Sequence, residues 1–252
     1  DWDNINFSHV PSVASARYKK AFNRNTTKFA EYVAALVKGE DPTVKVNAAA
    51  VYPYDVLKGI NSYSNNYGKT ELDHIVAQWD ALPNFVGDAN ILPLVDVSGS
   101  MCCPAGGKGS TTTCMDVAVS LGLYLAEKNQ GKFKDTFLTF SDRPKLMTLK
   151  GNIVEKMNQM VKSDWGMGTD LHKAFEKILD VAVKGEVPQA EMPEMVLILS
   201  DMQFNQCARF DDSAMKMIAR KFEEAGYEMP KIVFWNLNAA DNVPVKYDTR
   251  GV

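Results

Sequence analysis

Four short apolar runs separated by amphipathic stretches fill the chain after residue 90, and they constrain the fold more than any other feature. The runs span residues 91–95, 136–140, 195–199 and 232–237. The stretches between them have helical spacing, at about residues 115–129, 152–162, 170–183 and 212–225. Short buried strands that alternate with helices are typical of βαβ units around a parallel sheet. The sequence therefore predicts an α/β fold with a Rossmann-like, doubly wound, mostly parallel sheet.

Two prolines shape the details of this sheet. Residues 145–149 follow Pro144 and predict a short edge strand. Pro93 lies inside the first apolar run, although a proline in a central strand removes a hydrogen bond of the ladder. The position of Pro93 therefore conflicts with a central place for that strand.

The first third of the chain has helical spacing and no strand-like run. Residues 12–38 predict one or two helices that end at Gly39. Residues 48–60 predict a short helical turn broken at Pro53, and Thr70 is the candidate N-cap of a helix that reaches about Leu82. We therefore expect an N-terminal all-α segment over residues 1–88 and an α/β domain over residues 89–252.

Composition excludes several classes of protein. Of the 252 residues, 46% are hydrophobic and 23% are charged, which excludes a disordered or fibrous chain. No apolar run reaches about 18 residues, so we expect no membrane partner. The formal net charge of −3 gives no chain-wide attraction to nucleic acid. Because only four cysteines and no secretory signal are present, we expect an intracellular, cytoplasmic protein, and the absence of an initial Met suggests a trimmed N-terminus.

A group of oxygen-bearing side chains follows the first apolar run. Asp96, Ser98 and Ser100 form an Asp-x-Ser-x-Ser sequence at the expected carboxyl end of that strand, where open α/β sheets bind ligands. Thr169 precedes a predicted helix, and Asp201 follows the run at 195–199. Hard oxygen ligands suit Mg²⁺ or Mn²⁺. The alternative is an ordinary turn that caps the next helix, because Ser and Asp favour such positions.

These residues resemble the metal-ion-dependent adhesion site of a von Willebrand factor A domain. The family's Asp-x-Ser-x-Ser motif falls on Asp96, Ser98 and Ser100, its Thr on Thr169 and its second-loop Asp on Asp201. The companion stretches are similar to those of an uncharacterised family, found also in viral genomes, that resembles the TROVE module of Ro ribonucleoproteins. They span residues 139–141, 165–170, 199–202 and 234–237.

The resemblance carries expectations about architecture. In Ro proteins an all-helical repeat domain, which binds RNA, is joined to such an A domain. An A domain continues into a last strand and helix beyond the point where this chain stops, so we expect a sheet short by one strand or a lost C-terminal tail. For a viral member of the family, the expected compartment is the host cytoplasm.

Our first hypothesis is a non-enzymatic binding module that recruits a protein through one Mg²⁺ (or Mn²⁺). Two carboxylates and three hydroxyl oxygens would neutralise the ion and leave one coordination position open, which a carboxylate of the partner would fill. The expected partner-binding rim comprises Met101, Lys108, Trp165, Asp170 and Met202. Met101 and Met202 are also candidates for the core, and Trp165 for simple packing.

The segment between the motif and the next helix contains three of the four cysteines. Cys102, Cys103 and Cys114 lie in a Gly- and Thr-rich insertion, and Cys207 follows the run at 195–199. If these loops are neighbours, the four thiols form a candidate Zn²⁺ site or a redox-sensitive disulfide. The adjacent pair Cys102 and Cys103 is poor zinc spacing, so four reduced, unconnected thiols are the simpler interpretation.

A basic stretch near the N-terminus supports RNA binding as the alternative function. No acidic residue lies between Asn4 and Ala30, and this stretch contains five basic residues: Arg17, Lys19, Lys20, Arg24 and Lys28. With its interleaved aromatic residues, such a helix could follow a phosphate backbone. The simpler interpretation is a solvated helix face with its aromatic side chains in the core.

From the sequence we expect that the chain is not an enzyme. His9, His74 and His172 lie in separate regions, so no catalytic set follows from spacing. The Gly-rich segment at 106–111 departs from the phosphate-binding loop motif, because Gly109 follows Lys108 where Ser or Thr is required. A metal-dependent phosphodiesterase is the third hypothesis, and it lacks an identifiable general base.

Overall fold

The structure is a computed structural model that describes residues 1–60, 67–106, 109–163, 170–201 and 212–238. The chain forms two compact units. One comprises Asp1–Phe85 with Gly151–Asn158, and the other comprises Val86–Lys150 with Gln159–Val252.

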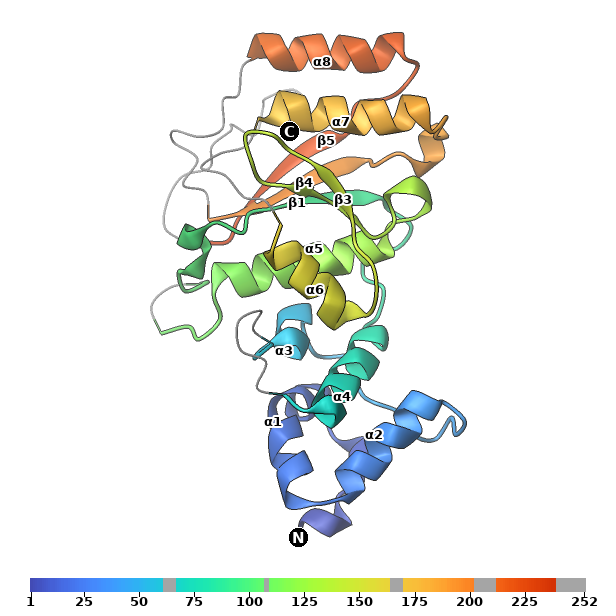
Figure 1. The fold of residues 1–252 in the computed structure, drawn as a ribbon, viewed down its shortest axis with the longest axis vertical. Helices are drawn as coiled ribbons and strands as arrows, with labels where there is room; N and C mark the ends of the chain where they lie inside the picture. The colour runs from blue at the N-terminus through green and yellow to red at the C-terminus, as the bar shows by residue number, and fades with distance from the viewer. Residues whose placement is uncertain (61–66, 107–108, 164–169, 202–211, 239–252) are drawn as a thin grey trace. The chain divides into compact units, whose positions relative to one another are not determined.

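The second unit is built on a five-stranded sheet with the order β3-β2-β1-β4-β5 (Figure 1). The strands are β1 (Ile91–Val95), β2 (Thr136–Thr139), β3 (Leu146–Thr148), β4 (Met195–Ser200) and β5 (Lys231–Asn236). All neighbouring pairs are parallel except β2 and β3, which pair antiparallel at one edge. The predicted mostly parallel α/β fold, including its short edge strand, is confirmed.

Helices connect the strands of the sheet. They are α5 (Cys114–Lys128), α6 (Ile153–Val161), α7 (Leu171–Lys184) and α8 (Asp212–Glu224), with 3₁₀ turns η3 (Gly99–Cys102), η4 (Gly131–Phe133) and η5 (Gln189–Glu191). In Figure 1, α7 and α8 lie on one face of the sheet and α5 lies on the other. Each of these helices agrees with its predicted range to within one residue at either end.

Pro93 does lie in the central strand, and the direction of its backbone explains why the strand tolerates it. The N–H of Asp96 donates to the carbonyl of Leu199, on the β4 side. Because N–H groups alternate between the two sides of a strand, the missing N–H of Pro93 belongs to the β2 side. The register between β1 and β2 begins only at Leu94. The proline therefore removes no bond between β1 and β4.

The main core lies between the sheet and the face covered by α7 and α8. Leu94 on β1, Ile198 on β4, Phe175 on α7 and Phe222 on α8 are all completely buried in one cluster. On the opposite face α5 approaches the sheet closely at Gly122, where an added Cβ would lie 2.5 Å from Cγ2 of Val95. Glycine at this position therefore sets the distance between α5 and β1.

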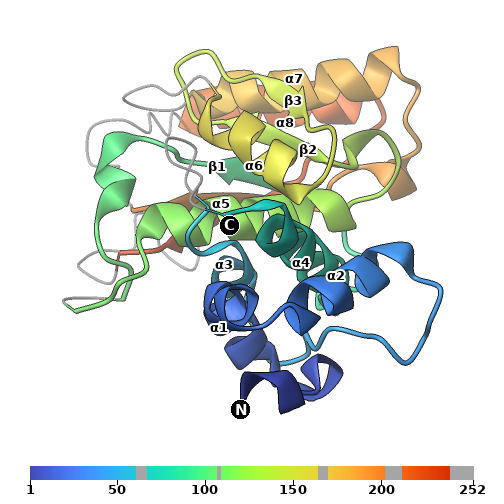
Figure 2. The ribbon, with the colours of Figure 1, turned by 60° about the horizontal axis from the view of Figure 1, so that its bottom comes forward.

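The first unit is helical (Figure 2). Its elements are η1 (Trp2–Asn4), η2 (Phe7–His9), α1 (Ser12–Asn25), α2 (Lys28–Lys38), α3 (Pro53–Leu57) and α4 (Lys69–Asp80), together with Ile153–Asn158 of α6. Phe7, Phe22, Phe29 and Val33 form its buried apolar cluster. The predicted helical stretch at 12–38 is thus two helices, separated where Thr26 adopts an extended conformation.

Two predicted boundaries in this unit are wrong. Pro53 begins α3 instead of breaking a turn, because the first turn of a helix does not need the N–H that proline lacks. The N-cap of α4 is Gly68, without a side-chain hydrogen bond, and Thr70 is already inside the helix. Within the described residues, no helix has the length and apolar character that a membrane crossing needs.

Candidate functional site

The candidate site is built around Asp96, the first residue after the central strand β1. Its side chain is only 3% exposed. Oδ1 accepts a hydrogen bond from the backbone N–H of Ser98 at 2.9 Å, and Oδ2 accepts one from the hydroxyl of Ser200 at 2.7 Å. These two bonds fix the carboxylate between the end of β1 and the end of β4.

The two serines of the motif lie together on the turn that follows. The hydroxyl oxygens of Ser98 and Ser100 are 3.0 Å apart. Ser98 is the N-cap of η3, and Ser100 lies within that turn. The Asp-x-Ser-x-Ser sequence therefore brings one carboxylate and two hydroxyls to the carboxyl edge of the sheet, as the pattern predicted.

Asp201 follows β4 directly and is 4% exposed. Its backbone N–H donates to Sδ of Met101 at 3.0 Å, so Asp201 contacts the turn that follows Asp96. Met101 is completely buried. Its complete burial contradicts the predicted place on a partner-binding rim and agrees with the alternative role in the core.

Several predicted residues lie outside the described part of the chain. They are Thr169, Trp165, Lys108, Met202 and Cys207. Within the described residues, no group of three or more His, Cys, Asp or Glu side chains is arranged to hold a metal ion. Because the predicted magnesium set has only two carboxylates among its five side chains, that finding concerns a zinc-type cluster and not the hydroxyl-rich set around Asp96.

The cysteine insertion doubles back on itself beside this site. Pro104 and Thr113 form an isolated antiparallel bridge, and the backbone N–H of Cys114 donates to the carbonyl of Cys103. The Sγ atoms of Cys103 and Cys114 are consequently 3.4 Å apart, whereas Cys102 is exposed. The structure thus brings two of the four thiols together.

Cys114 is the buried member of this pair. Burial raises the pKa of its thiol to about 12, and the hydrogen bond from Cys103 and the charges of Cys103 and Asp201 act in the same direction. Cys114 also starts α5, for which Thr113 and Asp116 form a reciprocal capping box. The insertion therefore ends at a capped helix N-terminus that is close enough to Asp201 for its charge to act on Cys114.

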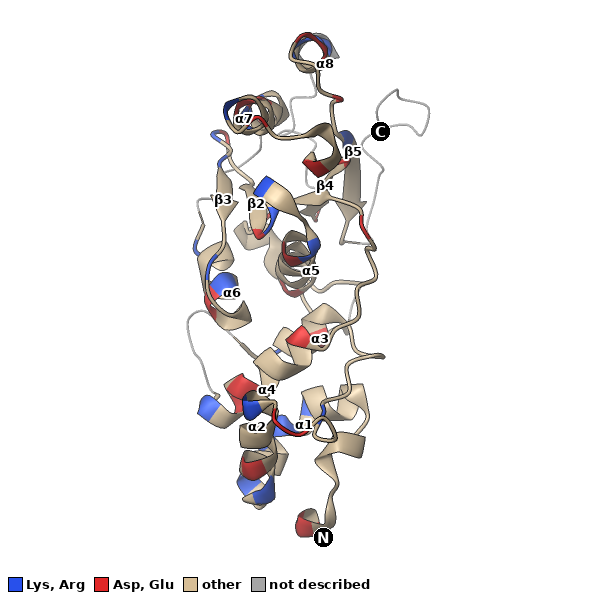
Figure 3. Ribbon diagram, turned by 90° about the vertical axis from the view of Figure 1, so that its right-hand side faces the viewer, with Lys and Arg blue, Asp and Glu red and all other residues tan. Residues whose placement is uncertain are grey.

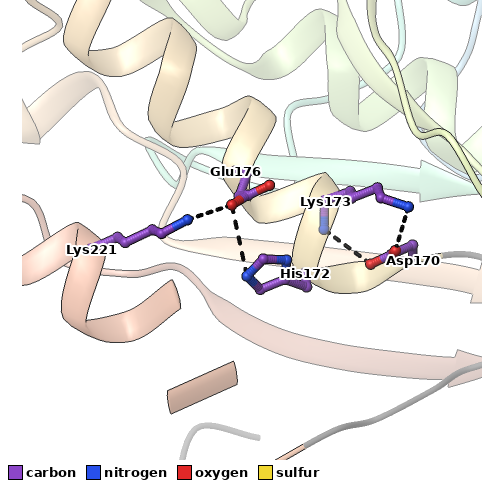
Figure 4. A network of polar contacts seen from close by, with 5 residues as sticks. All are labelled: Asp170, His172, Lys173, Glu176 and Lys221. Atoms are coloured by element: carbon purple, nitrogen blue, oxygen red, sulfur yellow. Dashed lines mark hydrogen bonds and ion pairs between the residues drawn. The ribbon is translucent and has the colours of Figure 1, made fainter. Parts of the chain in front are cut away.

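Asp170 marks the beginning of α7, immediately after Thr169. Its side chain accepts from the backbone N–H of Lys173 at 3.1 Å and pairs with the Lys173 amine at 2.9 Å (Figure 4). Burial works to raise the pKa of Asp170, but the contacts with Lys173 lower it overall. In the same network Glu176 joins His172 to Lys221 of α8. Asp170 thus acts as the N-cap of α7.

The predicted basic stripe on the N-terminal helices divides into exposed and buried members. Arg17, Lys20 and Arg24 are exposed on α1 at spacings of three and four, so they share one face of the helix. Lys28 lies on α2 and donates to the carbonyl of Asp3. Lys19 is only 2% exposed, so its prediction as a phosphate contact is wrong.

Lys19 belongs to a buried polar cluster that the sequence did not reveal. Its amine donates to the carbonyl of Ala16 at 2.6 Å, and burial lowers its pKa to about 8, with Lys20 adding to the effect and Glu71 opposing it. His74 is completely buried and bonds to the hydroxyl of Ser15 at 2.9 Å. Burial, together with the smaller effect of the Lys19 charge, lowers the pKa of His74 to about 3.

Fold and site together define a Rossmann-like α/β protein with a polar strand-end site and a helical N-terminal unit. The chain belongs to the family described as Domain of unknown function (DUF7788), which matches residues 90–252. Residues 1–89 match Domain of unknown function (DUF2828).

Two individual proteins are similar to the chain along nearly all of its length. An uncharacterized protein, L728, of Acanthamoeba polyphaga mimivirus is 34% identical over 96% of this chain and 43% of its own length, so the chain spans less than half of that relative. The crystal structure of the Deinococcus radiodurans RO (RSR) protein covers 96% of this chain and 49% of its own, with a TM-score of 0.56 and 16% identity. The likeness to a Ro protein is one of fold, and the expected relation to an uncharacterised, Ro-like family is confirmed at that level.

Proposed function

We propose that the chain is a non-enzymatic binding module that recruits a protein partner through a divalent cation held at the carboxyl ends of β1 and β4. The observation that supports this proposal is the buried carboxylate of Asp96 beside the paired hydroxyls of Ser98 and Ser100. This arrangement resembles the metal-ion-dependent adhesion site of a von Willebrand factor A domain.

The donor chemistry fits Mg²⁺ or Mn²⁺. Among the described residues, no cationic side chain forms an ion pair with Asp96, although its carboxylate is buried. A buried charge without a counter-charge is costly, and a divalent cation would offset that cost. Each carboxylate oxygen of Asp96 accepts one hydrogen bond and keeps a further lone pair for a ligand. Asp96, Ser98 and Ser100 would hold the ion, with Thr169 and Asp201 as the proposed further ligands.

The mode of recruitment follows from the ligand count. Mg²⁺ takes six oxygen ligands in a near-ideal octahedron, and the proposed set has five side chains. A carboxylate from an acidic segment of the partner would fill the remaining position. Recruitment would then depend on the metal, and a chelator would reverse it.

Calorimetric titration with Mn²⁺ tests the metal, using Asp96→Asn and the control Asp142→Asn. Asp142 is an exposed aspartate in the same unit. We expect saturable heat for the wild type and for Asp142→Asn, and none for Asp96→Asn. Equal heats for all three proteins would refute the proposal. A pull-down of partners in Mg²⁺ and in EDTA then tests recruitment.

RNA binding is the second candidate function. Arg17, Lys20 and Arg24 present three cations on one exposed face of α1, next to the half-exposed ring of Tyr18. Such a stripe can follow a phosphate backbone. The Ro-like fold supports this candidate, because in Ro proteins the helical part binds RNA.

A filter-binding assay with a single-stranded RNA pool tests this second candidate. The variant Arg17→Glu/Arg24→Glu removes two cations of the stripe, and Lys38→Glu on α2 is the matched control, since Lys38 is also exposed. We expect affinity that falls steeply with salt and that the double variant alone abolishes. An RNA-free preparation that binds no RNA at low salt would eliminate the candidate.

A further inference from the structure

A second feature of the α/β unit lies away from the Asp96 turn. A cavity of about 780 Å³ is bordered by the edge strand β3, the second half of α7, η4 and the residues after α6. Five lysines line it: Lys132, Lys145, Lys162, Lys177 and Lys184. We term this cavity the lysine pocket.

The charge of the lysine pocket contrasts with that of the chain. The whole chain has a formal net charge of −3, so the gathering of lysines is not a result of a basic composition. Among the described residues that line the pocket, Asp180 is the only carboxylate, and it pairs with Lys184 at 3.8 Å. Within the described residues, Lys162 and Lys177 form no ion pair. Figure 3 shows Lys and Arg positions, in blue, on α7 and beside β3.

Helix stability accounts for only part of this arrangement. Lys184 is in the last turn of α7, and Cε of Lys132 lies 3.6 Å from the position that a Cβ on Gly185 would take. Cations near the carboxyl end of a helix favourably oppose its dipole. Lys162 and Lys177 lie away from that helix end, and with Lys145 they come from three different segments. Their convergence leaves a positive potential that an anion would relieve.

The floor of the pocket determines what kind of anion fits. Leu146, Met147 and Val181 are half-buried apolar side chains that line the same cavity. The volume lies within the range of about 300–1,000 Å³ that is usual for sites of organic ligands. A simple phosphate ion would fill a small part of this space and leave the apolar floor uncovered. A ligand with a flat, weakly polar ring and one or more phosphates matches both features.

We propose that the lysine pocket binds a nucleoside phosphate, either free or at the phosphorylated end of an RNA strand. The base covers the apolar floor, and the phosphates lie among the lysine amines. Lysine amines bind phosphate as mobile point charges, so the pocket needs no rigid loop for this purpose. This site is independent of the cation proposed at Asp96.

Equilibrium titration of the full chain with ATP in EDTA-containing buffer tests the proposal. EDTA removes divalent cations, so the result does not depend on the Asp96 site. The test variant is Lys162→Glu/Lys177→Glu, and Lys216→Glu is the control because Lys216 is an exposed lysine of α8 outside the pocket. Lys177→Gln is a milder variant that removes one charge. Circular dichroism verifies that each variant is folded.

We expect wild type and Lys216→Glu to bind ATP equally. Orthophosphate should bind at least about tenfold more weakly than ATP, since it cannot cover the floor. The double variant should weaken ATP binding by about tenfold or more, and Lys177→Gln by less. Undiminished ATP affinity in the double variant, or an equal loss in Lys216→Glu, would overturn the proposal.

Competition with oligouridylate identifies the source of the ligand. Displacement of ATP by the 5′-phosphorylated strand but not by the unphosphorylated one would support an RNA end as the ligand. Binding of ATP without displacement by either strand would support a free nucleotide. Failure of ATP and of both strands to bind would overturn the proposal, whatever the outcome of the Mn²⁺ titration.

Discussion

Both units of the chain bury polar side chains, but on different kinds of backbone. In the helical unit, Lys19 projects from α1 and His74 from α4, and each bonds to a group on α1. In the α/β unit, Asp96 and Asp201 lie directly after the ends of two adjacent parallel strands. In the first arrangement the bond between Ser15 and His74 links α1 to α4, whereas the second collects oxygens at the edge where α/β sheets bind ligands. Burial of a polar group therefore does not by itself indicate function, and we chose Asp96 for the proposed metal site because of its place in the topology.

The comparison assumes that each unit has its own packed core. Large-to-small substitutions in these cores test the assumption, and they have the largest expected effect on the free energy of unfolding. Phe175 in the α/β unit and Phe29 in the helical unit are almost completely buried. We expect Phe175→Ala and Phe29→Ala each to lower the free energy of unfolding by about 3–5 kcal/mol. Urea denaturation measures the free energy of unfolding. A loss below about 1 kcal/mol for either variant would mean that the unit containing the substitution lacks such a core.

The pH dependence of stability tests the structural role of His74. Its pKa is about 3 in the folded chain against an ordinary value of 6.5. The folded state therefore holds the ring neutral, while the unfolded chain takes up a proton below pH 6.5. This contribution to stability is complete above about pH 6.5 and is lost as the pH falls towards 3, by at most about 1.4 kcal/mol per pH unit.

Urea denaturation at a series of pH values measures this slope, with His74→Gln as the comparison. We expect a smaller loss of stability between pH 6.5 and pH 5 in the variant, because glutamine does not titrate. An identical slope in both proteins would show that other groups cause the acid sensitivity.

Thr113 is a polar residue that we expect to stabilise the fold without binding the metal. Its side chain accepts from the backbone N–H of Asp116 and caps α5. We expect Thr113→Ala to lower the free energy of unfolding by about 1 kcal/mol, Thr113→Ser to restore most of it, and Mn²⁺ affinity to remain unchanged in both. A loss of Mn²⁺ binding in Thr113→Ala would contradict the separation of the cap from the metal site.

The smallest expected effect is a difference in alkylation rate between the described thiols, which lie in different environments. Cys102 is exposed, whereas Cys114 is buried, and its pKa is raised to about 12. Because the thiolate is the reactive form, we expect iodoacetamide to modify Cys102 first and Cys114 last at neutral pH. Peptide mass spectrometry over time measures the order. Early modification of Cys114 would contradict its burial.

The sequence was a good guide to the α/β unit, for reasons that are local. Apolar runs of strand length predicted the positions of β1 and β4, and the Asp-x-Ser-x-Ser motif placed Asp96 at the end of β1. The burial of Lys19 escaped prediction because it depends on α4 and Tyr67, over whose ring the amine lies at 5.0 Å. The lysine pocket escaped it because its cations come from separate segments, and no short-range pattern links them.

The most direct test of the central claim is to count bound Mn²⁺ by electron paramagnetic resonance, in which the sharp signal of the free ion disappears on binding. The wild type and Asp142→Asn should each remove one Mn²⁺ per chain from solution, and Asp96→Asn should remove none. Mn²⁺ bound equally by Asp96→Asn and wild type, or by neither, would contradict the account.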